Sequence, residues 1–254
     1  MTKTIVWFRQ DLRLNDNPAL KYACDEGEII PLFILDKNDR SLGGASKWWL
    51  HHSLKKLEAS LGGLVFRKGD PLSILKSLIE KTGASGVYWN RGYEPHIVER
   101  DTDIKSSLSE NEFNARSFNG SVVREPWEIE TGSGGPYKVY TPFWKTVRDR
   151  SVDAPLSAPS SLPAPDDWPE SEVLEDWSLG AAMNRGAEVV RPFVQLGEQA
   201  AQSRLGAFMA SKVAEYDRTR DLPAVDGTSN LSENLALGEI SPAQCWHARP
   251  PAPP

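Results

Sequence analysis

The stretch TIVWFRQDLRLNDNPALKYACDEGEIIPLFILD, residues 4–36, decides the fold class. Its ends, Thr4–Arg9 and Glu28–Asp36, are short apolar runs rich in β-forming residues, which is typical of buried strands. Between them, residues 15–23 have a helical pattern, and Asp16 is the expected N-cap. A strand, a helix and a second strand in this order predict parallel pairing through a crossover.

The same alternation continues to residue 119. The predicted helices are Ser46–Leu61, Pro71–Thr82 and Pro95–Glu112, and the further strands are Leu64–Lys68, Val87–Asn90 and Asn114–Asn119. Because Pro31 has no N–H to donate, we expect it near the start of its strand. Five strands separated by helices indicate the α/β class, with an N-terminal doubly wound, Rossmann-like parallel sheet. Ligands of such sheets bind beyond the carboxyl ends of the strands, here the loops after Arg9, Asp36 and Asn90.

Several site classes are disfavoured by missing residues. The first strand-to-helix loop contains no glycine, so the dinucleotide fingerprint of a dehydrogenase is absent. The glycines of TGSGG, residues 131–135, are interpreted as a turn. The two cysteines are far apart and outside any CxxC pair, which argues against a disulfide framework and a cysteine zinc site. His51 and His52 lack a third ligand, so we expect no metal site.

Charge and hydropathy indicate which classes of partner and which cell compartment to expect. The chain carries 29 Lys and Arg against 35 Asp and Glu, and neither residues 1–130 nor residues 131–254 have a basic excess. This balance argues against strong non-specific binding of nucleic acid. No apolar run approaches the ~20 residues of a membrane span, and the start has no secretory signal. We therefore expect a cytoplasmic monomer with no membrane contact.

The second half begins with a linker and ends in helical segments. Five prolines fall within residues 153–170, which predicts an extended, semi-rigid connection. Gly197–Asp221 has an apolar stripe at helical spacing, and Ser241 with Pro242 resembles the N-cap and first position of another helix. The residues that follow Pro192 are too few to build a core of their own. We therefore expect a truncated or frame-shifted piece of a larger helical domain.

Five segments, in order, resemble one family, the DNA photolyases and cryptochromes. They are WFRQDLRLNDNPAL (7–20), ASKWWLHHSLKKL (45–57), VYWNRGYEP (87–95), GGPYKVYTPFWK (134–145) and the stretch 216–248. The likeness is greatest to the bacterial cyclobutane-dimer photolyases. It implies an α/β antenna domain over 1–130, an interdomain linker over 131–172 and the truncated start of an all-helical FAD-binding domain over 173–254.

The resemblance also implies an activity, that of a deoxyribodipyrimidine photo-lyase. Family members repair cyclobutane pyrimidine dimers in DNA by light: the damaged pair is flipped out of the duplex, and excited reduced flavin donates an electron to it. The expected catalytic region lies outside this sequence, so we predict no catalytic residue here and no repair by this chain alone. Damaged DNA is the expected partner of a full-length member. A cryptochrome-type photoreceptor, a non-catalytic antenna or nucleotide-binding module, and a gene remnant remain alternatives.

Matched positions supply the candidate flavin contacts. They are Tyr216, Thr228, Ser229, Asn230, Leu231 and Ser232. Short hydroxyls and backbone N–H groups at a helix start suit a pyrophosphate. Asn230 stands where many members have arginine, which predicts a weaker charge contact. Glu233 and Asn234 replace the usual Pro–His pair, which implies a different local loop.

A second set of matched positions implies an antenna chromophore, a folate or a deazaflavin. The candidates are Phe33, Asp36, Lys47 and Glu94, which lie around the predicted strand ends. A glutamate that binds folate in some members falls near Ile97 here. That difference favours deazaflavin or no antenna.

Overall fold

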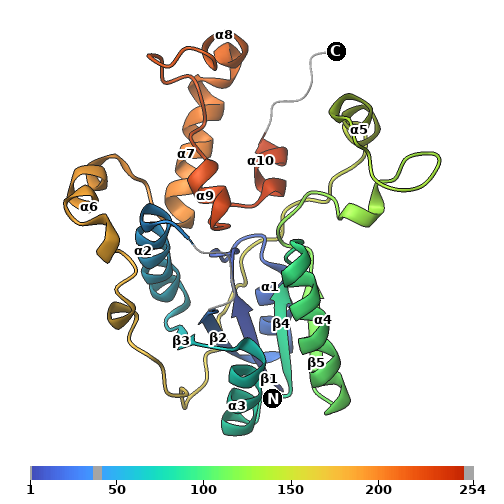
Figure 1. The fold of residues 1–254 in the computed structure, drawn as a ribbon, viewed down its shortest axis with the longest axis vertical. Coiled ribbons are helices and arrows are strands. Elements are labelled where there is room, and N and C mark those ends of the chain that lie inside the picture. Colours follow the sequence, from blue (N-terminus) through green and yellow to red (C-terminus); the bar gives the residue numbers. More distant parts are fainter. Residues whose placement is uncertain (1, 37–41, 249–254) are drawn as a thin grey trace.

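Five parallel strands form one sheet in the order β3-β2-β1-β4-β5 (Figure 1). The computed structural model describes residues 2–36 and 42–248. The strands are β1 (Thr2–Phe8), β2 (Gly27–Leu35), β3 (Val65–Lys68), β4 (Gly86–Asn90) and β5 (Asn114–Phe118). Central β1 pairs with both β2 and β4, so that Ile5 lies opposite Ile30 on one side and Val87 on the other. The predicted doubly wound sheet is confirmed, and its strand order reverses between β1 and β4.

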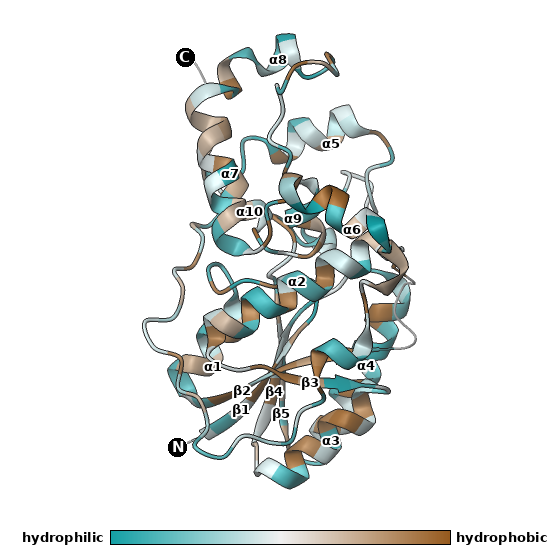
Figure 2. Ribbon diagram, turned by 90° about the vertical axis from the view of Figure 1, so that its left-hand side faces the viewer, coloured by the Kyte–Doolittle hydropathy of each residue, from teal (hydrophilic) through white to brown (hydrophobic). Residues whose placement is uncertain are grey.

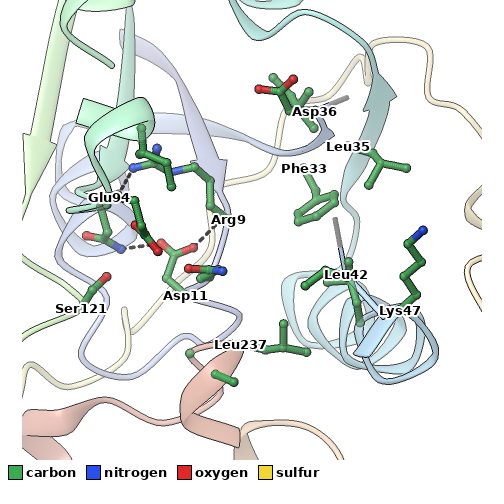
Figure 3. Close-up of a pocket in the computed structure, with 18 of the residues that line it drawn as sticks. Arg9, Asp11, Phe33, Leu35, Asp36, Leu42, Lys47, Glu94, Ser121 and Leu237 are labelled. Atoms are coloured by element: carbon green, nitrogen blue, oxygen red, sulfur yellow. Dashed lines mark hydrogen bonds between the residues drawn. The ribbon is translucent and has the colours of Figure 1, made fainter. Parts of the chain in front are cut away.

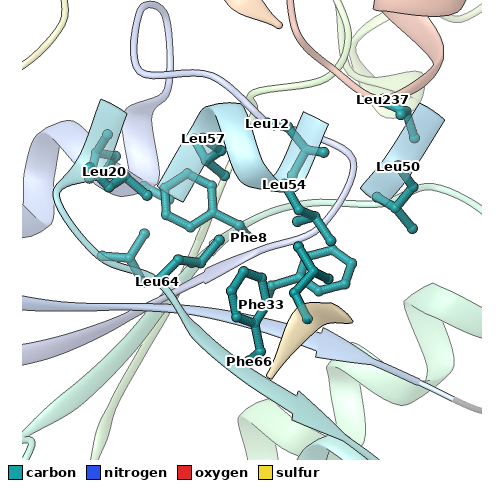
Figure 4. Packing of buried hydrophobic residues seen from close by; sticks show 14 of the residues in the cluster. Phe8, Leu12, Leu20, Phe33, Leu50, Leu54, Leu57, Leu64, Phe66 and Leu237 are labelled. Atoms are coloured by element: carbon teal, nitrogen blue, oxygen red, sulfur yellow. The ribbon is translucent and has the colours of Figure 1, made fainter. Parts of the chain in front are cut away.

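Helices cover both faces of this sheet (Figure 2). On one face, α1 (Pro18–Glu26) and α2 (Gly44–Leu61) pack over a cluster that includes Phe8, Phe33 and Phe66 (Figure 4). On the other face, α3 (Pro71–Thr82) and α4 (Pro95–Glu110) pack over Trp7 and Trp89. Alternate strand residues face opposite sides, so neighbours such as Trp7 and Phe8 enter different cores. Both cores are closed, which fixes the strand ends in place.

The helix α2 buries the side chains that its spacing predicts. Trp49, Leu50, Leu54, Leu57 and Leu61 are all at most 9% exposed. Together with Trp48, which is also buried, they form much of the core on this face of the sheet. A continuous apolar face of this kind is what a helix over a parallel sheet needs.

Two local expectations in the first strand–helix–strand unit are wrong. The N-cap of α1 is Asn17, whose Oδ1 accepts from the N–H of Leu20 at 3.1 Å. Asp16 instead has a left-handed backbone and accepts from the N–H of Leu156 at 3.0 Å. Pro31 lies in the middle of β2, opposite Val6. It is tolerated because β3 begins to pair with β2 only at the next residue.

The second half contains short helices joined by irregular chain. The helices are α5 (Tyr140–Val147), α6 (Arg185–Val190), α7 (Glu198–Ser211), α8 (Tyr216–Thr219), α9 (Ser232–Ala236) and α10 (Pro242–Ala248). Single 3₁₀ turns are formed by Pro126–Glu128, Leu174–Trp177, Ala181–Met183, Arg191–Phe193 and Val213–Glu215. Figure 1 shows α5 and α7–α10 grouped above the upper edge of the sheet. The linker runs back along the α/β part, where the N–H of Ile29 donates to the carbonyl of Pro163 at 2.8 Å.

The long helix predicted over residues 197–221 is interrupted. The helix α7 ends at Ser211, and the 3₁₀ turn Val213–Glu215 separates it from α8. The Lys212 ammonium pairs with Asp226, and Phe208 meets Tyr216 edge to face at 5.8 Å across the bend. Only Ala201 of α7 is buried. With so little packing along the helix, these local contacts set the chain direction.

The helical segments have only a small core of their own, formed by Ala201, Leu231 and Ile240. Residues 234–241 and Glu198 bond to the α/β part, as described below. Within the described ranges, no helix combines the length and apolar character of a membrane span. The same residues contain no group of three His, Cys, Asp or Glu side chains placed to hold a metal ion.

Candidate functional site

A cleft of about 1290 Å³ opens at the carboxyl ends of β1, β2 and β4 (Figure 3). It lies beside the point where the strand order reverses, which is where open α/β sheets bind ligands. All four residues predicted for an antenna chromophore line it: Phe33, Asp36, Lys47 and Glu94. The structure therefore brings together side chains that the sequence separates by as many as 61 positions.

One wall of the cleft is polar and built from paired charges. Arg9 follows β1, and its Nη1 donates to both carboxylate oxygens of Asp101, at 2.9 and 2.8 Å. Arg100 donates to Asp36 at 2.9 Å and to Asp101 at 3.2 Å. The guanidinium carbons of Arg9 and Arg100 lie 4.9 and 5.0 Å from the ring centre of Trp7. This network holds the strand ends rigidly and neutralises most of the charge on the wall.

The end of β4 is held to the end of β1 by a buried amide. Asn90 is 3% exposed, and its Nδ2 donates to Asp11 at 2.6 Å and to the N-cap residue Asn17 at 2.8 Å. The N–H of Arg9 donates to the other oxygen of Asp11 at 2.6 Å. These bonds fix the glycine-free first loop in one conformation. The loop is therefore a rigid part of the cleft floor.

The opposite wall is apolar. Figure 3 shows Phe33, Leu35 and Leu42 on the side of β2 and α2, facing the polar wall across the cleft. Trp177 lies behind Phe33, with ring centres 6.2 Å apart. One apolar wall and one polar wall suit a flat, partly polar ligand with an aromatic ring.

The side chains of the four residues predicted to contact an antenna chromophore differ in how free they are to contact a ligand. Asp36 is 6% exposed and already paired with Arg100, so it belongs to the floor. Phe33 is also 6% exposed and offers a ring face. Lys47 is half-buried, and Glu94 is exposed; neither forms an ion pair with another described residue. The charges near the cleft that pair with no other described residue thus include two cations, Lys47 on α2 and Lys68 at the end of β3, and the anion Glu94 at the start of α4.

A third side of the cleft comes from the far end of the chain. Leu237 and Gly238, which follow α9, line it together with Pro242 of α10. The sequence analysis missed this contribution, and it also missed Trp177. Residues 238–242 entered the sequence analysis as part of the stretch 216–248 and, at Ser241 and Pro242, as a helix start; nothing local connects them with β2. Such contacts arise from the tertiary fold alone.

Burial shapes the electrostatics around the first loop. Arg13 is 1% exposed, and burial lowers the pKa of its guanidinium, although Asp11 and Asp16 oppose the shift. It donates to the carbonyls of Gly238 at 3.0 Å and Gly120 at 2.5 Å. Burial, followed by the neighbouring Glu125 carboxylate, raises the pKa of Tyr93, which also lines the cleft, to about 12.

The six predicted flavin residues lie on the helical side, away from this cleft. Lining residues of the cleft include none of Tyr216, Thr228, Ser229, Asn230, Leu231 and Ser232. Leu231 is buried in the small helical core, while Ser232 and Asn230 are exposed.

The residues of this motif bond to one another. The Thr228 hydroxyl donates to Asn230 at 3.0 Å, and the Asn230 amide donates to Asp226 at 3.1 Å. Asn230 has a left-handed backbone, and Arg204 donates to its carbonyl. The motif is therefore ordered, with polar groups on one edge.

A smaller cavity of about 420 Å³ lies between the first loop and the start of α7. Glu198 accepts there from the N–H groups of Leu14 and Asn15, at 2.8 and 2.9 Å. The candidate flavin residues do not line this cavity either. Its contacts join the two parts of the chain.

Comparison with known proteins identifies relatives of this fold and site. The family model for DNA photolyase matches residues 4–165. A deoxyribodipyrimidine photo-lyase from Agrobacterium fabrum is 45% identical over 96% of this chain, and Cryptochrome-2 from Arabidopsis thaliana is 32% identical over 94%. The crystal structure of a bacterial class III photolyase from Agrobacterium tumefaciens superposes with a TM-score of 0.94 at 44% identity, covering 98% of this chain and 53% of that one. The chain spans 52% of the A. fabrum relative and 41% of the cryptochrome.

Proposed function

Because the chain belongs to the DNA photolyase family, we propose that it serves the light-driven, FAD-dependent repair of cyclobutane pyrimidine dimers in DNA, and that its cleft holds a light-harvesting chromophore. One observation carries the second part: Phe33, Asp36, Lys47 and Glu94 converge on a single cleft at the switch point of the sheet. The higher identity to a photolyase than to a cryptochrome supports the repair function over photoreception. The location in the cytoplasm and the monomeric state stay predictions.

The cleft fits a flat chromophore better than a nucleotide. Its polar wall has little spare positive charge, because Arg9 and Arg100 are both committed to Asp101. Among the described lining residues, phosphate groups would find Lys47 and the exposed Lys68, which lie on the β2, β3 and α2 side and not on the polar wall. A ring system could instead lie between the polar wall and Phe33, with one anionic group near Lys47. The departure at Ile97 from the folate-binding glutamate of some members supports a deazaflavin.

The residues at 228–232 fit one edge of an FAD molecule. Ser229 and Ser232 supply hydroxyl donors for phosphate oxygens, the Thr228 hydroxyl orients Asn230, and buried Leu231 anchors the motif to the helical core. FAD supplies the photochemical electron when bound. This chain's part is to bind and orient the phosphate side of the cofactor. No residue of the motif encloses a ring system, so we expect the chain alone not to repair DNA.

Absorption spectra of the purified chain test the antenna proposal. The chain is mixed separately with an 8-hydroxy-5-deazaflavin, with 5,10-methenyltetrahydrofolate and with FAD, and bound ligand is measured after gel filtration. We expect retention of the deazaflavin and loss of that retention when Phe33 is replaced by Ala. Retention of neither antenna probe would refute the cleft assignment.

A repair assay tests the rest of the proposal. Ultraviolet-irradiated oligo(dT) is illuminated without oxygen in the presence of the chain and chemically reduced FAD, and dimer loss is compared with a control that contains the reduced FAD without protein. We expect no difference for the chain alone. Light-dependent loss of dimers above that control would show that residues 1–254 suffice, and our account of the flavin edge would be wrong.

A further inference from the structure

A buried carboxylate joins three separate segments of the chain. Glu239 is 0% exposed, and it forms no ion pair with any residue that the structure describes. Its Oε1 accepts from the Ser53 hydroxyl at 2.5 Å and from the N–H of Gly197 at 2.8 Å. Its Oε2 accepts from Asn234 at 2.6 Å and from the indole of Trp49 at 3.4 Å. Four donors from α2, the start of α7 and α9 thus converge on one side chain.

The segment that carries Glu239, residues 234–241, also packs against the loop that follows β1. The N–H of Leu12 donates to the carbonyl of Leu237 at 3.1 Å, and Arg13 donates to that of Gly238 at 3.0 Å. Ser241 donates to the side chain of Asp16. The segment is therefore held from both sides, by the first loop and, through Glu239, by α2.

This segment is the third side of the cleft. Leu237 and Gly238 line the cleft, whereas the next residue, Glu239, points away into the protein. The donors on α2, Trp49 and Ser53, follow Lys47, the lysine of the same helix that lines the cleft. Any movement of Glu239 relative to α2 would therefore change the distance between the Leu237 wall and Lys47.

We propose that Glu239 is a positioning residue for the cleft: its carboxylate sets the Leu237 wall against α2 and so gives the cleft its ligand-binding shape. A carboxylate is required because both oxygens accept two bonds each. A glutamine has an NH₂ group in place of one acceptor. In either orientation that group would face two donors, and two of the four bonds would be lost. This proposal rests on the proposed function only in the experiments that measure ligand affinity.

The test compares Glu239→Gln with Glu233→Gln, the same chemical change on an exposed side chain of α9, one residue before the segment. Amide hydrogen exchange is followed in peptides that cover residues 10–16, 195–199 and 234–241, with β4 as the reference. We expect exchange in these peptides to rise about tenfold or more in Glu239→Gln, with β4 unchanged and Glu233→Gln like the wild type. Affinity for the 8-hydroxy-5-deazaflavin and for 5,10-methenyltetrahydrofolate is measured on the same samples.

A general loss of stability would also raise hydrogen exchange, so a second control variant separates that effect from the role of Glu239. Leu78→Ala, in α3 on the opposite face of the sheet, lowers overall stability without touching the cleft. We expect Glu239→Gln to weaken probe binding about tenfold, while Leu78→Ala binds like the wild type at a temperature where all variants are folded. Unchanged exchange at residues 234–241, or an equal rise in β4, would overturn the proposal. If the wild type binds neither probe, the antenna function fails, and the exchange experiment still decides the role of Glu239.

Discussion

Replacing Gly238 by alanine should destabilise the protein far more than a glycine replacement normally does. Gly238 follows α9 with φ +66°, and a Cβ there would lie 2.0 Å from the carbonyl oxygen of Gln10 and 2.6 Å from the Cα of Asp11. Both neighbours are backbone atoms, so no side chain can rotate away. The segment 234–241 must therefore move off the first loop to accommodate a single methyl group.

A matched glycine separates this clash from backbone strain. Gly83 follows α3 with φ +68°, and a Cβ there would meet no heavy atom within 4 Å. Gly83→Ala should cost only the left-handed strain, about 1 kcal/mol. Gly238→Ala carries the same strain. It should also break the bonds from Leu12 and Arg13 to the carbonyls of Leu237 and Gly238, a further ~2–4 kcal/mol for one neutral and one charged donor.

Urea unfolding followed by tryptophan fluorescence measures both losses. We expect the free energy of unfolding to fall by about 1 kcal/mol for Gly83→Ala and by about 3–5 kcal/mol for Gly238→Ala, with similar m-values. Losses that agree within about 1 kcal/mol would refute the reasoning, because the close approach of Gly238 to Gln10 would then be irrelevant to stability.

Three further predictions concern single side chains. Lys47→Gln should weaken binding of 5,10-methenyltetrahydrofolate about two- to fivefold, because it removes a partly exposed ion pair with a ligand carboxylate, worth ~0.5–1 kcal/mol. Fluorescence titration measures the Kd, and an unchanged Kd would contradict the prediction. Burial lowers the pKa of His51 and His52 in the folded protein. Below about pH 6.5 these two histidines therefore bind more protons in the unfolded chain than in the folded one. The stability of the folded protein is highest above that pH and falls as the pH is lowered. The double variant with Gln at both positions should therefore lose less stability between about pH 7 and pH 5 than the wild type, as judged by urea unfolding at each pH. Burial raises the pKa of Cys24 to about 11. Near pH 8 its thiolate fraction should therefore be about 100-fold lower than that of a thiol with pKa 9.0, and iodoacetamide should alkylate it about 100-fold more slowly. Alkylation as fast as that of glutathione would contradict this.

The fold of the α/β part could be predicted because each element carries its own boundary signals. The helix α3 has the predicted bounds, since Asp70 caps its start and Gly83 adopts the left-handed conformation at its end. In the helical half such signals mark the start of α10, where the Ser241 hydroxyl accepts from the N–H of Gln244 at 3.0 Å, but not the break near Lys212. Lys212 is a good helix former, and in the structure its ammonium pairs with Asp226, fourteen residues away. Periodicity within residues 197–221 carries no information about that contact.

The candidate site was predictable only where it follows from sheet geometry. Phe33 and Asp36 lie near the end of one strand, so the switch-point rule places them at the cleft whatever else the chain does. The availability of these side chains was not predictable, because it depends on partners: Arg100, from the middle of α4, occupies the carboxylate of Asp36. Trp177 and Leu237 reach the cleft from irregular segments whose positions no local pattern determines.

The interior of the first loop shows why the two parts of the chain form one structural unit. The Arg13 guanidinium is almost fully buried, and its partners are carbonyls of its own loop, of Gly120 after β5 and of Gly238 after α9. A buried cation is tolerated only when its donors are satisfied. A fragment ending near residue 130 would keep Arg13 and lose Gly238, and it would also leave the N–H of Leu12 without its acceptor on Leu237. The cleft at the carboxyl edge of the sheet therefore takes its final shape only when residues 234–241 are in place, although the strands that define its floor are complete by residue 118.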